Sequence, residues 1–502
     1  MKILVLNGSP SGKNSITLQT VLFIEQYCKK ASFEILDVGQ KIRSFEKDFS
    51  GAAVSLREAD LVLFCYPVYT FLVPAQLHRF IELIKENGVD LRAKYASQIT
   101  TSKHFYDVTA HQFIQDNCDD LGMRYIRGLS ADMEDLLGKK GQKEALSFFR
   151  HVLWSMKEGL YEPHRYTASV SAAKAPVIDE AGYDGEREAG ARTEHDGQRE
   201  ADTCTEQDAQ AAGNTDEGSA GRVAIVADIL PGEEGAGLRE MIRKLQKESR
   251  MTCKVFNIRE FPFRGGCLGC FHCAADGTCI YKDGCDQWLR DGIQKADAIV
   301  YAYAVRDHSM GSRFKTFDDR QFCNGHRTVT MGKPVGYLVD GCLDQEENLR
   351  MVMEARAQVG GNYPAGIACS SCAANLSEPG SGETDRQIRM LAETLEFAVR
   401  NHYSQPKNFY GVGGLKIFRD LIYQMQGLMR EDHRFYKEHG FYDFPQKRKG
   451  MIAAMYLVGS MMNDPKLKKK LGGKMTEGML MPYQKVLKDH EKRLSHVFTE
   501  KT

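Results

Sequence analysis

The feature that most constrains this chain is an internal repeat. Residues Met1–Asn7 (MKILVLN) are similar to Arg222–Asp228 (RVAIVAD), and residues 59–64 (ADLVLF) are similar to 296–301 (ADAIVY). The first pair lies 221 residues apart and the second pair 237 residues apart, so an insertion lengthens the second copy. A repeat on this scale indicates that both copies share one fold.

Each copy alternates short apolar segments with segments of helical spacing. In the first copy, residues 2–6 and 59–66 are apolar runs typical of buried parallel strands. Residues 16–30 and 74–86 place apolar side chains on one helical face, and the start of the second helix recurs at 312–317. Strands that alternate with helices predict an α/β fold with a doubly wound parallel sheet in each copy.

The chain divides into four predicted regions. We expect an α/β domain at 1–165, a second α/β domain at 222–404 and a helical appendage at 405–502. Residues 166–221 contain few large apolar side chains and many Ala, Gly, Glu, Asp, Gln and Thr residues. Such a segment cannot bury enough surface to offset the entropy of ordering, so we interpret it as a disordered linker.

Charge and hydropathy exclude several classes of protein. Lys and Arg together number 67, as do Asp and Glu, so the chain lacks the basic excess expected of a nucleic-acid partner. No segment reaches the roughly 18–20 apolar residues that span a bilayer, and the N-terminus does not resemble a signal peptide. We therefore expect a cytoplasmic protein without a membrane span, in which the 14 cysteines are thiols rather than disulfides.

The loop Gly8–Ser15 (GSPSGKNS) follows the first strand and opens the first helix. A helix N-terminus at the carboxyl end of a strand offers free backbone N–H groups to a phosphate. The alternative is a polar turn that binds no ligand and in which a serine caps the helix. The residues expected to bind a phosphate here are Ser9, Ser11, Lys13, Asn14, Ser15 and Thr17.

Two further loops end at the same edge of the predicted sheet. Pro67, Val68 and Tyr69 follow the buried strand at 59–66, and Thr101 and Ser102 follow the next strand. An aromatic side chain beside free backbone amides suits a planar ring, which would stack on it and accept hydrogen bonds. We assign no catalytic acid or base; the nearest candidates are Tyr69 and His104.

Taken together, Gly-Ser-Pro-x-x-x-Asn-Ser at 8–15, Pro-Val-Tyr at 67–69 and Pro-x-x-Leu-x-x-Phe-Ile at 74–81 resemble the NAD(P)H-dependent FMN reductases of the flavodoxin-like superfamily. The resemblance covers nearly all of residues 1–150. It implies that the first loop binds the FMN phosphate, that residues 67–69 contact the isoalloxazine ring, and that NADH or NADPH is the electron donor. It also implies a dimer, either of two chains or of the two copies within one chain. Phe71–Leu72 depart from the family pattern.

The insertion in the second copy contains a dense group of cysteines. Cys267, Cys270, Cys273 and Cys279 have the spacing C-x2-C-x2-C-x5-C, with Cys285 as a substitute ligand. Four thiolates can hold a [4Fe–4S] cluster; zinc and metal-free thiols are the alternatives. The segment resembles the iron–sulfur flavoproteins, which share the FMN reductase fold and carry a compact four-cysteine motif at this place.

The second copy has lost the phosphate-binding features of the first. Its loop at 228–237 lacks Ser and Thr, and Glu233 and Glu234 would repel a phosphate. The next loop has lost Pro-Val-Tyr, and we interpret its residues 306–308 as a solvated turn. The flavin is therefore expected in the first copy, and the distinctive chemistry of the second copy in its cysteines.

These features predict a flavin-dependent oxidoreductase. NAD(P)H would reduce FMN in the first copy, and the flavin would pass electrons to a small molecule, a protein partner or the cysteine centre. One alternative is an iron–sulfur electron carrier that uses no nicotinamide. A second is a non-catalytic module whose cysteines sense redox state.

Overall fold

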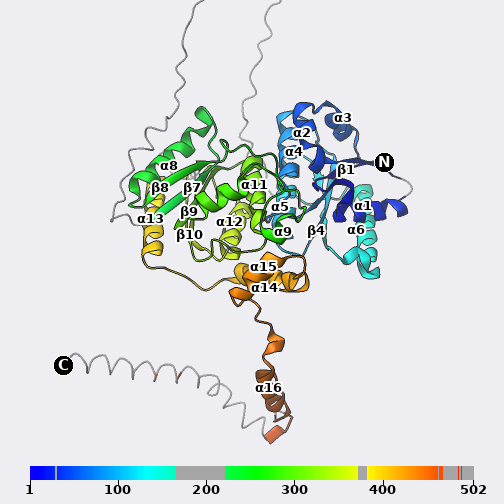
Figure 1. The fold of residues 1–502 in the computed structure, drawn as a ribbon. Coiled ribbons are helices and arrows are strands. Elements are labelled where there is room, and N and C mark those ends of the chain that lie inside the picture. The colour runs from blue at the N-terminus through cyan, green and yellow to red at the C-terminus, as the bar shows by residue number, and fades with distance from the viewer. Residues whose placement is uncertain are drawn as a thin grey trace, which may run out of the picture. The chain divides into compact units, whose positions relative to one another are not determined.

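The computed structural model confirms two parallel α/β domains, one for each copy of the repeat (Figure 1). The predicted linker lies outside the described residues except for Gly221, so the domain boundaries remain predictions. We refer to the two sheets with their helices as the first and the second domain. The residues that the structure describes are 1–28, 31–164, 221–370, 381–461, 463–466, 484 and 488.

The first domain is built on a parallel sheet of order β2-β1-β3-β4-β5, with β6 also paired to β4. Strand β3 lies at the centre of this order, and residues 61–66 are buried, as its continuous apolar sequence predicts. The strands are β1 (Lys2–Asn7), β2 (Ser32–Leu36), β3 (Leu61–Pro67), β4 (Tyr95–Ser102), β5 (Arg124–Tyr125) and β6 (Leu129–Asp132).

Helices cover both faces of this sheet, because alternate residues of each strand point to opposite sides. Leu18 of α1 and Phe149 of α6 pack with Val5 on one face, while Leu77 and Phe80 of α4 pack with Leu6 on the other. The helices are α1 (Ile16–Tyr27), α2 (Val38–Lys47), α3 (Ser50–Glu58), α4 (Ala75–Glu86), α5 (Asp107–Asp120) and α6 (Lys139–Glu158).

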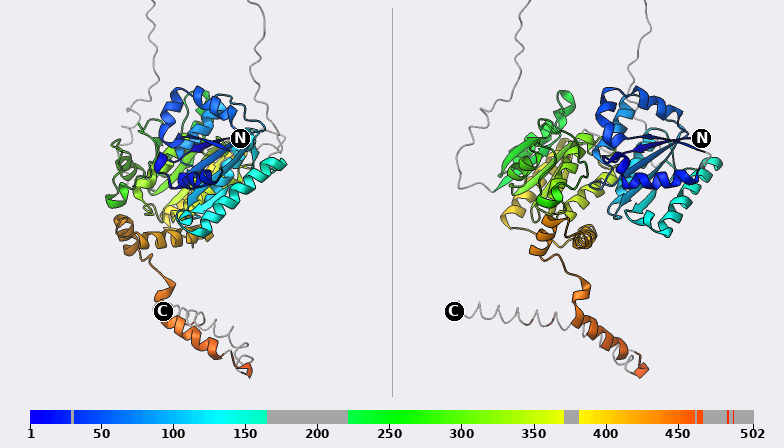
Figure 2. Two further views of the ribbon diagram at one scale, coloured as in Figure 1. Left: turned by 90° about the vertical axis from the view of Figure 1, so that its right-hand side faces the viewer. Right: turned by 45° about the vertical axis from the view of Figure 1, so that its right-hand side comes forward.

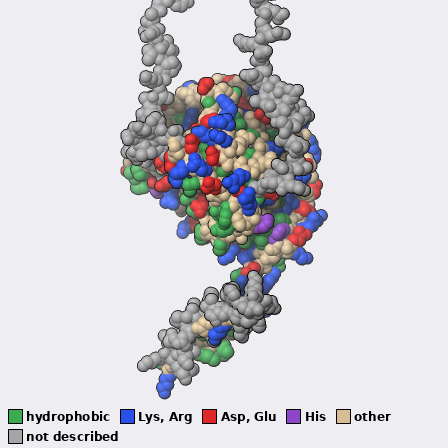
Figure 3. Space-filling model, turned by 90° about the vertical axis from the view of Figure 1, so that its left-hand side faces the viewer, with side chains coloured by type: hydrophobic (Ala, Val, Ile, Leu, Met, Phe, Trp, Pro, Cys, Tyr) green, Lys and Arg blue, Asp and Glu red, His purple; other side chains and the backbone are tan. Residues whose placement is uncertain are grey.

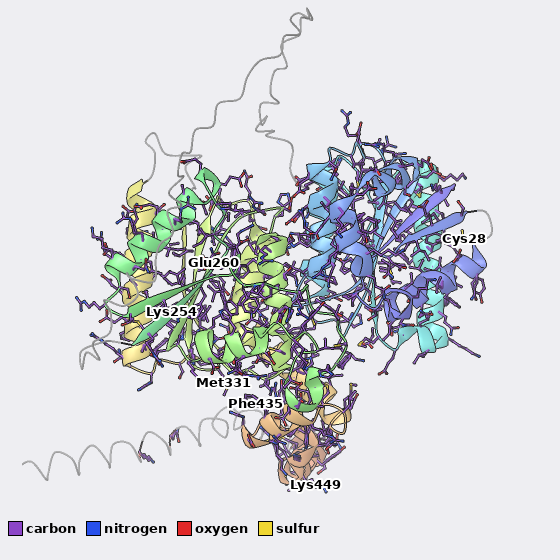
Figure 4. The ribbon with its side chains drawn as sticks, turned by 45° about the horizontal axis from the view of Figure 1, so that its top comes forward. Cys28, Lys254, Glu260, Met331, Phe435 and Lys449 are labelled. Atoms are coloured by element: carbon purple, nitrogen blue, oxygen red, sulfur yellow. The ribbon has the colours of Figure 1, made fainter. Side chains whose placement is uncertain are left out.

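The second domain repeats this arrangement with the strand order β11-β10-β9-β7-β8. Lys254 on β8 and Glu260 just beyond it mark the strand that leads into the cysteine-containing insertion (Figure 4). The strands are β7 (Arg222–Ala227), β8 (Thr252–Asn257), β9 (Ala298–Ala304), β10 (Pro334–Asp340) and β11 (Tyr363–Cys369). The helices are α8 (Ala236–Glu248), α9 (Cys273–Asp276), α10 (Cys285–Trp288), α11 (Gly311–Arg320), α12 (Glu347–Val359) and α13 (Ser381–Arg400).

The two domains pair within the chain through α4 and α11, which lie between the two sheets (Figures 1 and 2). These helices occupy equivalent places in the repeat. One apolar cluster includes Leu77 and Phe80 from the first domain and Phe314 and Phe317 from the second. The pairing is therefore that of a dimer whose two members belong to one polypeptide.

The C-terminal region is helical, as predicted. Helix α14 (Phe409–Gln424) packs against both domains: a Cβ placed on Gly414 would lie 3.0 Å from atoms of Phe105 and of Val359. Helix α15 (Arg430–Glu438) follows it. Residues 436–502 form a unit of their own, in which α16 (Lys449–Met461) exposes several large apolar side chains.

The surface agrees with the balanced composition where it can be seen. The face shown in Figure 3 intersperses acidic and basic side chains. Among the helices that the structure describes, none has the length and apolar character needed to cross a membrane.

Candidate functional site

Three loops meet at the carboxyl edge of the first sheet, because β1, β3 and β4 are neighbours and run in the same direction. The Gly8 N–H donates to the Cys65 carbonyl at 2.8 Å, and the Val68 N–H donates to the Thr101 carbonyl at 3.2 Å. The hydroxyl groups of Thr17 and Thr101 lie 2.6 Å apart. The structure therefore brings together residues from all three loops that the sequence singled out.

The first loop is rigidly shaped by its own polar groups. The Asn7 amide donates to the Gly12 carbonyl at 3.0 Å and to the Asp37 carboxylate at 2.9 Å. Gly12 has a φ of +54°, and a Cβ there would lie 2.2 Å from the Gln40 side chain. Only glycine satisfies both conditions.

The N-terminus of α1 is suited to an anion. Ser15 caps the helix through a hydrogen bond from the Leu18 N–H at 3.3 Å. In the described chain, the N–H groups of Ile16 and Thr17 have no acceptor, so their partial positive charge is available to a phosphate. Of the predicted phosphate ligands, Ser9, Ser15 and Thr17 are buried, Ser11 is half-buried, and Lys13 and Asn14 are exposed.

The second loop contains a tight turn with two left-handed residues. Tyr69 and Leu72 exchange backbone hydrogen bonds of 2.9 and 3.0 Å, while Thr70 and Phe71 have φ values of +39° and +70°. Such a conformation costs about 1–3 kcal/mol for each non-glycine residue and persists only where the surroundings enforce it. Pro67, Val68 and Tyr69 are half-buried beside this turn.

Aromatic side chains and a histidine surround the third loop. The Phe71 ring lies 4.6 Å from that of Tyr106 and 5.4 Å from that of Phe105. Thr101 is buried, and Ser102 is half-buried. The exposed His104 contacts the Asp107 carboxylate at 3.0 Å.

The charge states of two groups near this loop follow from their surroundings. Burial would raise the pKa of Asp107, but hydrogen bonds from Ser130 and His104 outweigh it and hold that pKa below its ordinary value. Burial raises the pKa of Tyr69 well above its ordinary value. Tyr69 is therefore a neutral phenol that can donate a hydrogen bond.

The cysteine loop of the second domain carries free thiols in a strained backbone. Cys267, Cys273 and Cys279 are half-buried and Cys270 is exposed. The Gly269 N–H donates to the Cys267 sulfur at 3.4 Å, and Phe271 has a φ of +57°. Burial raises the pKa of Cys267 to about 12 and that of Cys273 to about 11, so both are protonated at neutral pH in this structure.

A buried arginine lies beside this loop. The Arg320 guanidinium forms a bidentate ion pair with Asp283 at 2.7 and 2.8 Å, and it lies 3.7 Å from the Cys279 sulfur. It also covers the Tyr281 ring at 4.5 Å. Its charge would stabilise a negatively charged group held by the loop. The sequence analysis missed this role.

Four thiols on one loop supply the donor set that an iron–sulfur cluster or a zinc ion requires. A tetrahedral zinc site holds sulfurs about 2.3 Å from the metal, which places them near one another. Over the described residues, no three cysteine sulfurs lie within 4.8 Å of one another. A cube-shaped iron–sulfur cluster holds its thiolates farther apart, and N–H hydrogen bonds to sulfur together with a nearby cation suit its negative charge.

Among the described residues, one group brings metal-ligating atoms within 4.8 Å of one another, namely His78, Glu82 and Asp307. It lies at the interface between the domains. The Lys85 ammonium contacts Asp307 at 2.8 Å. Burial lowers the pKa of His78, and the charges of Lys315 and Lys85 lower it further. These two cations already balance the carboxylates of this group.

The cysteine loop of the second domain packs against the second loop of the first-domain site, which contains Tyr69. A Cβ on Gly269 would lie 1.9 Å from the Tyr69 hydroxyl oxygen, so the close approach requires glycine. The Gln76 amide donates to the Cys267 carbonyl at 3.3 Å, and the rings of Tyr69 and Phe322 lie 5.7 Å apart. Two sites predicted separately, about 200 residues apart in sequence, thus share one interface.

The equivalent edge of the second domain does not fit a phosphate. A Cβ on Gly237, in the first turn of α8, would lie 2.6 Å from the Asp340 carboxylate, so a negative charge lies beside this helix turn. Ser370 donates to this carboxylate at 2.5 Å. Asp228 is buried and pairs with Arg259 at 2.6 Å. The residues present at this edge therefore do not fit FMN.

The turn at 306–308 is only partly solvated: Arg306 is exposed, as the sequence interpretation expects, but Asp307 and His308 are half-buried and paired. His308 contacts Asp120 at 3.2 Å and Glu346 at 3.1 Å, and Asp307 pairs with Lys85. Burial opposes a charge on His308, but hydrogen bonds to the two carboxylates outweigh it and raise its pKa to about 10. The interpretation failed for these two residues because the partners come from the other domain and from a distant helix.

The fold and the geometry of the first-domain edge define a flavin-dependent oxidoreductase. The family model for NADPH-dependent FMN reductase matches residues 1–132 and 223–366, more than half of the chain, and the chain belongs to this family. The match in two segments agrees with the internal repeat.

Individual relatives are more distant. The iron–sulfur flavoprotein of Archaeoglobus fulgidus is 28% identical over 178 residues, which cover 35% of this chain and 79% of that protein. The NAD(P)H:(acceptor) oxidoreductase FerB from Paracoccus denitrificans is 15% identical, with coverages of 31% and 97% and a TM-score of 0.27. An FMN-dependent NADH-azoreductase from Bacillus anthracis is 12% identical, with coverages of 32% and 99% and a TM-score of 0.24.

Proposed function

We propose that the protein uses NAD(P)H to reduce FMN held by the first domain, and that the electrons pass to a cluster held by Cys267, Cys270, Cys273 and Cys279. One observation carries the proposal: the cysteine loop packs on Tyr69, the residue expected to contact the flavin ring. A donor and an acceptor of electrons would then face each other across one interface.

The residues of the first domain divide into a phosphate set and a ring set. The free N–H groups of α1 and the Lys13 ammonium would bind the phosphate, supported by hydroxyl and amide groups of the first loop. The second and third loops would position the ring. The phosphate set is Ser9, Ser11, Lys13, Asn14, Ser15 and Thr17; the ring set is Pro67, Val68, Tyr69, Thr101 and Ser102.

FMN supplies the redox chemistry when bound, accepting a hydride from the nicotinamide and releasing electrons singly. The protein orients the ring and restricts water. Phe71, Phe105 and Tyr106 form an aromatic wall beside the ring loops, and the Phe418 ring packs 4.5 Å from that of Phe105. Tyr69, neutral and largely buried, separates the ring position from the cysteine loop without adding a charge.

The outer side of the cysteine loop offers an exit for electrons. Cys270 is exposed, and the neighbouring Phe271 side chain is 53% exposed. An acceptor that is a protein or a small organic molecule would approach the centre here. The alternative of a carrier that uses no nicotinamide shares this exit and differs only in its donor.

The first test is the visible spectrum of protein purified without oxygen, with flavin and iron measured per chain. We expect FMN, iron and loss of flavin absorbance on mixing with NADH or NADPH. If neither nicotinamide bleaches a bound flavin, the reductase activity is refuted and the carrier is favoured. A colourless protein would refute both.

A cysteine variant tests the route of the electrons. Cys270→Ser should leave flavin bleaching by NAD(P)H intact while slowing transfer to an added one-electron acceptor by at least about tenfold. The control is Cys253→Ser, a thiol on β8 outside the cysteine loop. Equal acceptor rates in both variants would show that electrons leave the flavin directly.

Flavin stoichiometry tests the assignment to one domain. Because the Asp340 carboxylate lies beside the first turn of α8 and would repel a phosphate, titration with FMN should saturate at one equivalent per chain. Saturation at two equivalents would contradict the assignment.

A further inference from the structure

The repeat places a matching pair of side chains on each interface helix. His78 and Glu82 on α4 correspond to Lys315 and Asp319 on α11, with one turn between the members of each pair. Both pairs are at the contact between the domains, and all but Glu82 are fully buried.

Each acidic member reaches the opposite domain in the same way. The Ala75 N–H donates to the Asp319 carboxylate at 2.9 Å, and the Ser312 N–H donates to the Glu82 carboxylate at 2.7 Å. Ala75 and Ser312 are equivalent residues of the repeat. Each helix therefore holds the loop that follows the third strand of the other domain.

The basic members differ between the copies. The Lys315 ammonium donates to the Tyr69 carbonyl at 2.9 Å and to the Thr70 hydroxyl at 2.6 Å, and it also pairs with Asp319. Both ring nitrogens of His78 are buried and have no hydrogen-bond partner among the described residues. Of these two equivalent residues, Lys315 thus places a buried cation against the other domain and His78 does not.

The residues held by Lys315 and Asp319 form the left-handed turn Tyr69–Leu72. Thr70 donates its hydroxyl proton to Asp319 at 2.5 Å, so the pair contacts both the backbone and a side chain of the turn. A turn with two non-glycine residues at positive φ needs such external contacts to persist. The equivalent turn Arg306–Ser309 has the same pair of backbone hydrogen bonds, both 2.8 Å.

We propose that Lys315 and Asp319 of the second domain are positioning residues for the flavin site of the first. They fix the Tyr69–Leu72 turn in the shape that receives the isoalloxazine ring. This inference rests on the proposed function for its catalytic consequence, although the contact itself does not require flavin. It assigns the second domain a part in the flavin site even though that domain has no phosphate site of its own.

The contact is tested first without flavin, by hydrogen exchange of the backbone amides in the apoprotein. Thr70→Val removes only the hydroxyl between Lys315 and Asp319. The double variant Lys315→Met with Asp319→Asn removes both buried charges together, which avoids leaving one unpaired. Glu82→Gln is the matched control, because it weakens the equivalent contact on the other domain.

We expect the first two variants to speed exchange in residues 69–75 by at least about tenfold, and Glu82→Gln to speed it only in residues 306–312. Unchanged exchange in residues 69–75 would overturn the proposed contact. This readout stays valid if the protein binds no flavin, so it separates failure of this inference from failure of the proposed function.

The second measurement uses flavin-loaded protein. Thr70→Val and the double variant should lower kcat with NADH or NADPH by at least about tenfold and alter the flavin absorbance spectrum, while Glu82→Gln should change kcat less than about twofold. All variants are compared at temperatures below their unfolding midpoints. Altered exchange with unchanged kcat and spectrum would overturn the positioning role and leave only a structural one.

Discussion

His308 shows how strongly the environment of one residue depends on distant parts of the chain. Asp120 of the first domain and Glu346 of the second both contact its ring. Asp307 and Lys85, which are close by, form their own ion pair. Because the two carboxylates outweigh the effect of burial, the pKa of His308 rises to about 10.

This shift predicts a dependence of stability on pH. A group whose pKa is higher in the folded state stabilises the fold fully below its unfolded pKa of about 6.5, and the contribution disappears as the pH rises through the folded value. His308→Gln should lower the free energy of unfolding by roughly 2–4 kcal/mol at pH 6 and much less near pH 10. Urea denaturation of both proteins across this range measures the difference.

The control is His151→Gln, which changes an exposed histidine on α6. It should give the same pH dependence as the unaltered protein. A difference between His308→Gln and the unaltered protein that stays constant from pH 6 to pH 10 would show that His308 is not charged in the folded state.

Single residues also show what the sequence could predict. The position of the loop at 8–15 between a strand and a helix was predictable because its polar residues lie within ten residues of one another and follow a strand directly; its binding of a phosphate stays a prediction. Lys315, Asp319 and Arg320 were not predictable, because charged residues on a helix normally face solvent. Their partners, Tyr69 and Asp283, are distant in sequence, and no local pattern records the contact.

At the scale of elements, α14 closes the aromatic side of the first-domain site. Its Phe418 ring lies 4.5 Å from those of Phe105 and His326, and Gly414 allows the helix to approach Phe105 closely. The helix comes from the appendage, yet it contacts the loop that follows β4. It thereby joins the C-terminal region to the candidate site.

Phe418→Ala should therefore loosen this loop. We expect a loss of about 1–3 kcal/mol in the free energy of unfolding, at the low end for a buried aromatic because the side chain is only half-buried. Hydrogen exchange should increase in residues 102–106 and in α14. The exposed Phe409 of the same helix provides the control, since Phe409→Ala should change neither measurement.

Helices and strands were predicted best where the spacing of apolar residues stays regular over several turns or along a whole strand. The apolar run at 59–66 matches β3 (Leu61–Pro67), and the helical spacing at 16–30 matches α1, which ends earlier at Tyr27. The path of the cysteine loop was not predictable. The left-handed Gly269 packs on Tyr69 of the other domain, a contact that local propensity does not record.

At the scale of the whole molecule, we expect the pairing of the domains to persist without a continuous connection between them. The interface contains an apolar cluster and the buried ion pair of Lys315 with Asp319. We expect that a protease site inserted between residues 190 and 191 can be cut without separating the domains. Size-exclusion chromatography in moderate salt should recover both fragments in one peak.

The same experiment has a direct negative outcome. Two separate peaks after cleavage would show that the connection, rather than the interface, keeps the domains together. Loss of bound flavin from the separated first domain would then measure how much the second domain contributes to the site.

Because both copies belong to one polypeptide, each copy can acquire substitutions that the other does not share. In a symmetric dimer encoded by one gene, every substitution occurs at both sites, so neither site can change alone. A duplicated and fused gene removes this constraint: Asp340 could lie beside the first turn of one helix, and a lysine could replace the histidine at one of two equivalent positions, without altering the other copy. The two copies within one chain can therefore have different binding sites while they still pack against each other.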